Sequence, residues 1–156
     1  MKNTPNWFNE YYDAWKNTGW NKIWHIYLGK LLRLYSTFDE KTKEEFEIID
    51  TKEKYGTLRV YTSFDIPFNL ELEMLSNFTC YECGKIKKNL FGRHVIYISL
   101  GYILPYCKDC MKKYKAKKNG KFIKHYTNKF SVHHFENNKE TISYYRIKNN
   151  WIERLE

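Results

Sequence analysis

The first third of the chain carries apolar side chains at helical spacing. Thr4-Pro5 is typical of a helix start, because Thr caps a helix N-terminus and Pro fits the first helical position. Aromatic residues then recur every three or four positions from Trp7 to Trp15. After a break at residues 17–19, a second apolar stripe predicts a helix from about Trp20 to Tyr35. Because these aromatic residues fall on one helical face, they indicate a protein core rather than a ligand cage.

The pattern then changes to one that is typical of β-strands. Residues 46–49 and 57–62 are rich in β-branched and aromatic residues and predict two strands. The stretch from Phe68 to Phe78 fits either a strand or a helix, and its Leu, Glu and Met residues favour a helix. Further on, the apolar runs 95–98 and 102–104 predict a hairpin around Gly101.

The rest of the chain divides into a basic helix and a series of strands. Residues 111–118 predict a helix that ends at Asn119-Gly120, a favourable C-cap pair. Residues 121–156 predict a β meander. Its strands are expected at 131–135, 141–147 and 151–155, with a hairpin turn at 136–139.

Four cysteines form two Cys-x2-Cys pairs, Cys80 with Cys83 and Cys107 with Cys110, separated by 23 residues. Each pair points two thiolates at one spot, so two pairs complete the tetrahedral shell of a Zn²⁺ ion. The alternative is two disulfides, which form mainly in oxidising compartments. We expect a structural zinc, because four thiolates leave no position for water or substrate.

The surroundings of the cysteines favour a treble-clef-like finger over a zinc ribbon. Gly84 allows a sharp turn after the first pair, whereas Cys110 runs directly into a helix-favouring sequence. The predicted fold class is therefore α+β: N-terminal helices with a short antiparallel sheet, a treble-clef-like zinc finger and a C-terminal β meander. The length of 156 residues allows one domain of ordinary size or two very small ones. The expected parts are an N-terminal body (1–79), a zinc finger with a basic helix (80–119) and a β extension (120–156).

Three motifs in order resemble those of a known family. They are Lys52-Glu-Lys-Tyr-Gly-Thr-Leu-Arg-Val-Tyr61, then Cys80-x2-Cys83-Gly84, then Gly101-Tyr-x4-Tyr-Cys107-x2-Cys110. This combination resembles the small, mostly uncharacterised zinc-binding proteins of bacteriophages and prophages, over roughly residues 20–112. The resemblance implies a mobile-element origin and supports a helix at 67–79, but it implies no known activity. The Lys- and Tyr-rich tail beyond residue 113 departs from the family pattern.

The positive charge of the chain is confined to its middle. The formal net charge is +9, yet residues 1–79 carry ten Lys/Arg against twelve Asp/Glu, and residues 136–156 carry four of each. Residues 80–135 carry thirteen basic and two acidic side chains, a net charge of +11. Such focused charge is typical of a polyanion-binding surface, and the alternative is a solvated lysine face.

We take the basic residues of this segment as the candidate polyanion-binding set. Because Lys acts as a point charge, contact with nucleic acid is expected mainly at the backbone. Interleaved aromatics are candidate stacking groups: Tyr114, Phe122, Tyr126 and Phe130. The candidate basic residues are Lys85, Lys87, Lys88, Arg93, Lys108, Lys112, Lys113, Lys115, Lys117, Lys118, Lys121, Lys124 and Lys129.

These features predict a binding protein and not an enzyme. The leading hypothesis is a non-catalytic zinc module that contacts nucleic acid or a nucleoprotein complex. The alternative is a phage-encoded inhibitor that docks on a host defence complex, for example of the CRISPR type. An HNH-like nuclease is a third reading, but His94 is the only histidine between the cysteine pairs and the basic helix has none. His125, His133 and His134 lie further on, and we expect them to be ordinary surface or half-buried residues.

The same analysis sets expectations for location and partners. The sequence has no run of about eighteen apolar residues, so no membrane partner is expected. No secretory leader is recognised, and the expected location is the cytoplasm, which is that of the host cell if a phage encodes the chain. No nucleotide-binding loop or hydrolase motif is present, so no small-molecule substrate is expected.

Overall fold

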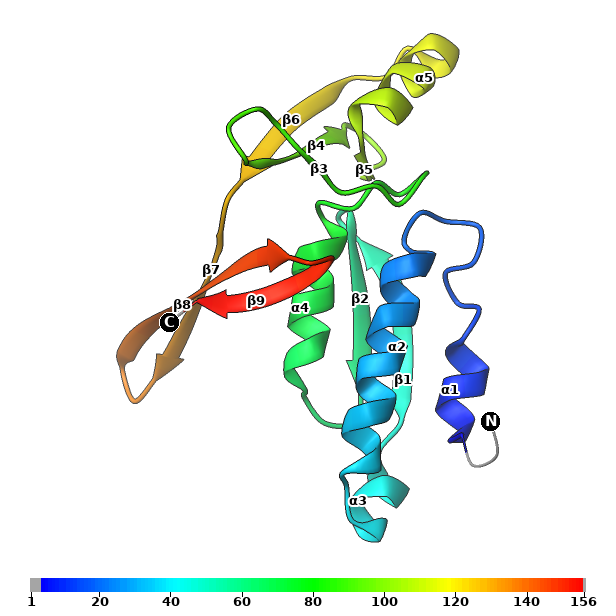
Figure 1. Cartoon of the computed structure of the whole chain (residues 1–156), viewed down its shortest axis with the longest axis vertical. Coiled ribbons are helices and arrows are strands. Elements are labelled where there is room, and N and C mark those ends of the chain that lie inside the picture. Colours follow the sequence, from blue (N-terminus) through cyan, green and yellow to red (C-terminus); the bar gives the residue numbers. More distant parts are fainter. Residues whose placement is uncertain (1–3, 156) are drawn as a thin grey trace.

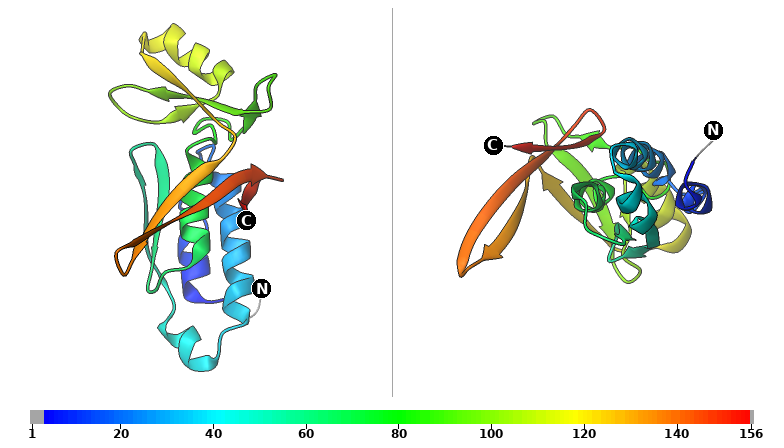
Figure 2. Two further views of the ribbon diagram at one scale, coloured as in Figure 1. Left: turned by 90° about the vertical axis from the view of Figure 1, so that its left-hand side faces the viewer. Right: turned by 90° about the horizontal axis from the view of Figure 1, so that it is seen from below.

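The computed structural model describes residues 4–155 and arranges them as an α+β fold (Figure 1). A helical body with a two-stranded sheet lies at the bottom of that view, a small finger carries α5 at the top, and a three-stranded meander lies at the side. Figure 2 shows that the meander projects from one side of the body. The predicted fold class is confirmed, while the division into three independent parts stays a prediction.

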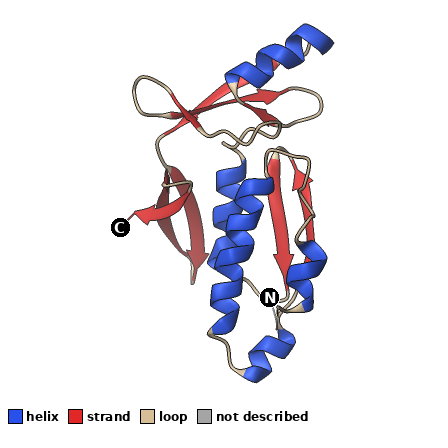
Figure 3. Ribbon diagram, turned by 45° about the vertical axis from the view of Figure 1, so that its right-hand side comes forward, coloured by secondary structure: helices blue, strands red, loops and turns tan. Residues whose placement is uncertain are grey.

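Helices α2 and α4 pack beside one antiparallel hairpin to form the body (Figure 3). The predicted helix at 20–35 and the predicted helix at 68–78 are both confirmed. Short helix α3 was not predicted. It begins after Asp39, whose side chain accepts a hydrogen bond of 2.7 Å from the backbone N–H of Thr42. The elements are α1 (Asn6–Tyr11), α2 (Asn21–Ser36), α3 (Glu40–Glu45), β1 (Ile48–Lys54), β2 (Thr57–Thr62) and α4 (Pro67–Ser76).

The core of the body is rich in aromatic and aliphatic side chains. Trp24 and Tyr27 of α2 are fully buried and stack with their ring centroids 5.2 Å apart. Leu58 of β2 and Leu72 of α4 are also fully buried and belong to the same core. The predicted apolar stripe of α2 is therefore the face that packs inward, as its spacing indicates.

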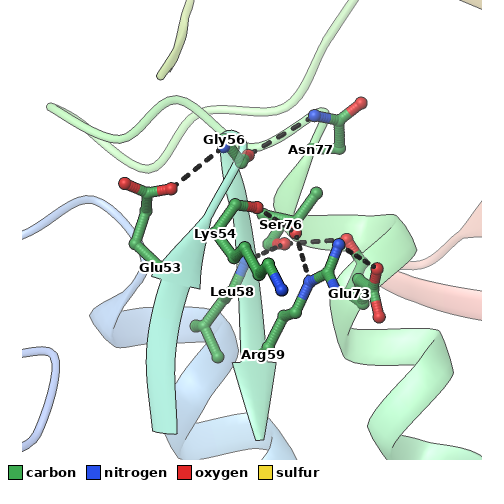
Figure 4. A network of polar contacts seen from close by, with 9 residues as sticks. Glu53, Lys54, Gly56, Leu58, Arg59, Glu73, Ser76 and Asn77 are labelled. Atoms are coloured by element: carbon green, nitrogen blue, oxygen red, sulfur yellow. Dashed lines mark hydrogen bonds and ion pairs between the residues drawn. The ribbon is translucent and has the colours of Figure 1, made fainter. Parts of the chain in front are cut away.

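A polar network joins β2 to the end of α4 (Figure 4). The hydroxyl of Ser76 accepts a hydrogen bond of 2.8 Å from the backbone N–H of Leu58, and both residues are buried. Arg59 pairs with Glu73 at 3.3 Å. Since buried backbone groups need partners, this network fixes the position of the hairpin on the helix.

The finger is a small sheet with one helix. Strands β3 (Lys87–Lys88), β4 (His94–Ser99), β5 (Pro105–Tyr106) and β6 (Phe122–Thr127) are antiparallel, and β4 pairs with each of the others. Helix α5 (Lys108–Lys118) follows β5. It ends at Asn119, which adopts the left-handed conformation of a C-cap.

Two details of the finger differ from the prediction. The partner of β4 across Gly101 is 105–106 and not 102–104, because residues 100–104 form the connecting loop. In addition, β6 pairs with β4 over six residue pairs and does not join the C-terminal meander. The local pattern assigns residues 122–127 to the meander without a strand of their own, because the partner of β6 lies about thirty residues away in the sequence, beyond the reach of such patterns.

The meander consists of β7 (Phe130–Glu136), β8 (Lys139–Lys148) and β9 (Trp151–Leu155). Its three predicted strands and its predicted turn are confirmed. Asn137-Asn138 and Asn149-Asn150 form the two turns, and all four have positive φ. Two successive residues with positive φ are the mark of a type I′ turn, which Asn tolerates well.

The meander is anchored to the body through Trp151. Its ring N–H donates a hydrogen bond of 2.8 Å to the carboxylate of Glu71 in α4. The ammonium of Lys30 in α2 lies 5.2 Å from the Trp151 ring centroid. Ile147 and Ile152 are buried beside it in the shared core. The C-terminal strands thus contact both α2 and α4.

Within residues 4–155, no helix is both long enough and apolar enough to cross a membrane.

Trp20 links the start of α2 to the end of α4, which leads to a first prediction. Its ring N–H lies 3.1 Å from the backbone oxygens of both Ser76 and Thr79 and donates to them. Trp20→Phe keeps the aromatic packing but removes the donor from the Thr79 oxygen and leaves the Ser76 oxygen with only the hydrogen bond from Thr79 N–H, which lowers the free energy of unfolding by about 1–3 kcal/mol. Urea denaturation followed by circular dichroism measures the change. Tyr55→Phe, at an exposed turn, is the control, and an unchanged midpoint for Trp20→Phe contradicts the prediction.

Candidate metal centre

The two cysteine pairs meet where the finger joins the body. Cys80 and Cys83 lie on the turn after α4, and Cys107 and Cys110 lie at the start of α5. The four Sγ atoms all lie within 4.8 Å of one another. The Sγ atoms of Cys83 and Cys107 are 3.7 Å apart. A tetrahedral ion with metal–sulfur bonds of about 2.3 Å needs sulfur atoms about 3.8 Å apart, so the cluster has the size of a four-thiolate metal site.

All four cysteines are free thiols, so the disulfide alternative is wrong. A set of four sulfur donors selects a soft or borderline tetrahedral ion and disfavours Mg²⁺ or Ca²⁺, which prefer oxygen. Among the residues that the structure describes, these cysteines are the one group of three or more Cys, His, Asp or Glu side chains close enough to share a metal. The predicted metal ligands are therefore brought together.

Backbone hydrogen bonds shape the first pair into a tight turn. The N–H of Gly84 donates to the carbonyl of Cys80 at 2.9 Å, and the N–H of Cys80 donates to the carbonyl of Lys85 at 3.0 Å. Gly84 has a φ of +79°, a conformation that other residues rarely adopt. Tyr81 N–H donates to the carbonyl of Pro105 at 2.8 Å, which brings the first pair beside β5 and hence beside Cys107.

The second pair is set by the start of α5. Cys107 is the N-cap residue, and its carbonyl accepts a hydrogen bond of 2.8 Å from Met111 N–H. The helix begins at Lys108, three residues earlier than predicted, so Cys110 lies in its first turn. The positive end of the helix dipole therefore lies next to the sulfur atoms, on the side where a metal-bound thiolate cluster would carry its negative charge.

The first pair is held against the body by Gly19. The N–H of Gly19 donates a hydrogen bond to the carbonyl oxygen of Tyr81. A Cβ atom at Gly19 would overlap the carbonyl oxygen of Cys80 and the backbone nitrogen of Gly84. No side chain larger than hydrogen fits between these two backbones. The sequence indicates the Asn17-Thr18-Gly19 break only as a helix interruption. In the structure this break is the part of the body that supports the first cysteine pair.

The thiols differ in their acidity. Burial raises the pKa of the Cys80 thiol to about 11, and burial together with the neighbouring sulfur atoms raises the pKa of Cys110. At Cys83, burial opposes ionisation, but hydrogen bonds from Lys85 N–H and from the other thiols lower its pKa overall. Four thiolates this close repel one another, so their full ionisation requires a bound cation.

No protein family model matches the chain, and neither the curated proteins nor the solved structures provide a match. The assignment of the four-cysteine cluster as a metal site therefore rests on its geometry alone. The resemblance to zinc-binding phage proteins stays a hypothesis that rests on the three sequence motifs.

The candidate basic residues are spread over the finger rather than over one helix face. Six of them lie on α5, at positions 108, 112, 113, 115, 117 and 118. Lys87 and Lys88 form β3, and Lys124 lies in β6. The structure brings Lys87, Lys88, Lys108 and Lys124 together around a hollow of about 440 Å³. The remaining four, Lys85, Arg93, Lys121 and Lys129, lie on loops and turns and are not in that hollow.

Three of the four candidate stacking aromatics are packed rather than free. Tyr114 and Phe122 pack on each other with ring centroids 5.5 Å apart, and both also contact Tyr106. Phe130 packs edge-on against Phe78. Only the fourth, Tyr126, is well exposed, at 51%. Sequence spacing alone could not tell packed aromatic residues from exposed ones. For example, Tyr114 of α5 and Phe122 of β6 are packed because these two elements contact each other in the fold.

Sequence reasoning missed a second basic hollow, of about 670 Å³, between the finger and the meander. Lys88 lines it together with Arg146 and Lys148, which lie outside the predicted basic segment. Glu153 pairs with Arg146 at 2.7 Å and with Lys148 at 3.8 Å, so part of this charge is already neutralised. The register of β8 with β9, which places Glu153 opposite Arg146, produces this pairing.

In the described part of the chain, no histidine belongs to a group of three or more side chains that could share a metal. His94 is buried in β4, and burial together with the nearby charge of Lys88 lowers its pKa. His133 contacts the carboxylate of Glu140 on the neighbouring strand. His125, His133 and His134 are exposed, as expected, whereas His94 is buried.

The contact at Gly19 gives a second prediction. Gly19→Ala forces the first cysteine pair away from the body, which weakens metal binding by roughly 10–100-fold, the range seen when the support of a metal ligand is lost. Competition with a chromogenic chelator measures the affinity.

Gly29→Ala is the matched control, because this glycine lies within α2 and the nearest atom to an added Cβ is the flexible Arg33 side chain at 3.8 Å. That variant should bind metal normally and be slightly more stable, since Ala favours helix over Gly. Equal metal affinity in the two variants would show that the contact at Gly19 does not support the site.

Proposed function

We propose that this protein is a non-catalytic, zinc-stabilised module that binds nucleic acid or a nucleoprotein through the basic surface of its finger. The observation that carries the proposal is the net charge of +11 over residues 80–135, on a finger built around a four-cysteine site. A polyanion is the natural partner for charge concentrated on a scaffold of this kind.

Zinc is the proposed ion because four sulfur donors at tetrahedral spacing suit it best. Cys80, Cys83, Cys107 and Cys110 would hold it, and it would supply folding free energy rather than chemistry. The module is proposed to be non-catalytic because a complete thiolate shell offers no position at which a substrate or water binds the ion.

The proposed contacts are mainly to phosphates. Twelve of the thirteen basic residues in the segment are lysines, which attract phosphate without reading base edges. The surface therefore favours binding with little sequence preference. The phage or mobile-element origin, and with it the host cytoplasm as the location, rests on the resemblance of the sequence motifs alone.

One observation favours a second candidate, an inhibitor that docks on a host defence complex. Leu90 and Phe91 lie at the tip of the β3–β4 loop and are 102% and 88% exposed. The Asn89 side chain holds this tip in shape by accepting hydrogen bonds from the N–H groups of Phe91 and Arg93, at 2.9 and 3.0 Å. An ordered loop that presents two large apolar side chains is typical of a protein contact.

Salt dependence tests the nucleic-acid proposal. The affinity for DNA and RNA should fall steeply with salt, with a log–log slope of roughly −3 or steeper, because each neutralised phosphate releases counterions. The triple variant Lys112→Ala, Lys113→Ala, Lys117→Ala on α5 should flatten the slope by about 2–3. The control changes three exposed lysines of the body, Lys16, Lys41 and Lys54, and should leave the slope unchanged. A wild-type slope near zero contradicts the proposal.

The second candidate is tested with the loop-tip variant Leu90→Ser, Phe91→Ser. A host protein captured from lysate should stay bound to the wild type after nuclease treatment and be lost from this variant. Both side chains are exposed, so the melting temperature should not fall. Capture that disappears with nuclease, or that survives in the variant, contradicts docking through this loop.

A further inference from the structure

The outer face of the finger sheet combines aromatic rings with lysines. In an antiparallel sheet, directly paired residues share a face, and so do residues two positions apart along a strand. Val95 pairs with both Lys87 and Tyr126, and Tyr97 pairs with Lys124. These five residues therefore lie on one face, which we call the tyrosine–lysine face.

Lys124 lies between the two tyrosines of this face. Its ammonium is 5.0 Å from the ring centroid of Tyr126 and 5.9 Å from that of Tyr97. This cation–π contact holds the long lysine side chain against the sheet. It also places a positive charge beside two rings, of which Tyr126 is half exposed.

A hollow borders this face at its α5 side. Lys87, Tyr97, Lys108 and Lys124 line the space of about 440 Å³, and Asp109 is the one acidic side chain among its lining residues. The space has the size of a small-ligand site. The Tyr97 ring and the lysine ammonium groups in its lining match the two parts of a nucleotide, a flat base and a phosphate, and the Tyr126 ring lies on the same face next to Lys124.

We infer that the tyrosine–lysine face is a stacking platform for single-stranded nucleic acid, an inference that rests on the proposed function. Single strands have unpaired bases whose flat faces are free to stack on Tyr126 and Tyr97. A duplex keeps its bases stacked and paired, so it offers this face only phosphates. The rings therefore favour single strands, while the lysines bind either form.

The two other basic regions lack this combination. On α5, Tyr114 is packed against Tyr106 and Phe122 and offers no free ring to a ligand. In the hollow next to the meander, the lining includes no Phe, Tyr or Trp, its one ring is that of the buried His94, and Glu153 pairs with two of the nearby basic side chains. Both regions can attract phosphate, but only the tyrosine–lysine face joins a half-exposed ring to several cations.

The test compares fluorescently labelled oligo-dT, oligo-rU and a duplex of the same length, by anisotropy at two salt concentrations. Tyr126→Leu should weaken binding to both single strands by roughly 5–100-fold, the loss expected when one stacked base is released. Duplex affinity and all salt slopes should stay unchanged, because the substitution removes a ring and no charge. Tyr126→Trp should retain or strengthen single-strand binding.

Tyr61→Leu is the matched control. Tyr61 is an exposed strand tyrosine of the body with the Lys52 ammonium 5.3 Å from its ring centroid, so it repeats the lysine–tyrosine pair outside the finger. This variant should bind all three probes like the wild type.

The possible outcomes distinguish a failure of the proposed nucleic-acid binding from a failure of the stacking platform alone. If the wild type binds neither single strands nor duplex, the proposed function and this inference both fail. If the wild type binds with a salt slope but Tyr126→Leu has no effect, or weakens duplex and single strands equally, the inference alone is overturned. If Tyr126→Leu fails to fold, equal affinity of the folded Tyr126→Trp variant for single strands and duplex overturns it.

Discussion

The metal site depends on a contact between two backbones that leaves no room for a side chain. Gly19 lies directly against the turn of Cys80 to Cys83, and its N–H donates to Tyr81 within that turn. The next residue, Trp20, donates to two carbonyls at the end of α4, immediately before Cys80. Helix α2 therefore fixes both the start of the finger and the end of the helix that leads into it. The body thus holds Cys80 and Cys83 in place, and the start of α5 supplies Cys107 and Cys110.

This arrangement explains how so basic a finger can stay folded. Its lysines repel one another, and few of its side chains are buried, Ile96, Leu104, Tyr106 and Met111 among them. With a divalent ion bound, four thiolates would carry a net charge of about −2 at the N-terminus of α5, where the helix dipole favours negative charge. The last turn of α5 carries Lys115, Lys117 and Lys118, where the dipole favours positive charge. The ends of the helix thus complement both the metal site and the basic surface.

Local sequence patterns predicted the elements that depend on interactions between residues close together in the chain. The stripe of α2, the helix α4, the strands of the meander and the two cysteine pairs all follow from spacing along the chain. Residues 122–127 were assigned to the meander with no strand of their own, because the pairing of β6 with β4 depends on register between distant segments, which alternation alone does not determine. For the same reason Tyr97 was not recognised beside Tyr126. Their closeness follows from the pairing of Val95 with Tyr126, and no sequence spacing encodes it.

The distribution of charge also constrains how a polyanion can approach. The body (residues 1–79) carries a net charge of −2 and repels phosphate, while residues 80–135 attract it. A molecule with such opposed parts turns its positive end toward a polyanion before contact, which raises the rate of productive encounters. The meander adds no net charge through residues 136–156, and Glu153 neutralises part of the basic surface next to it. Attraction is therefore focused on the finger, and the position of the finger is in turn set by Gly19 and the four cysteines.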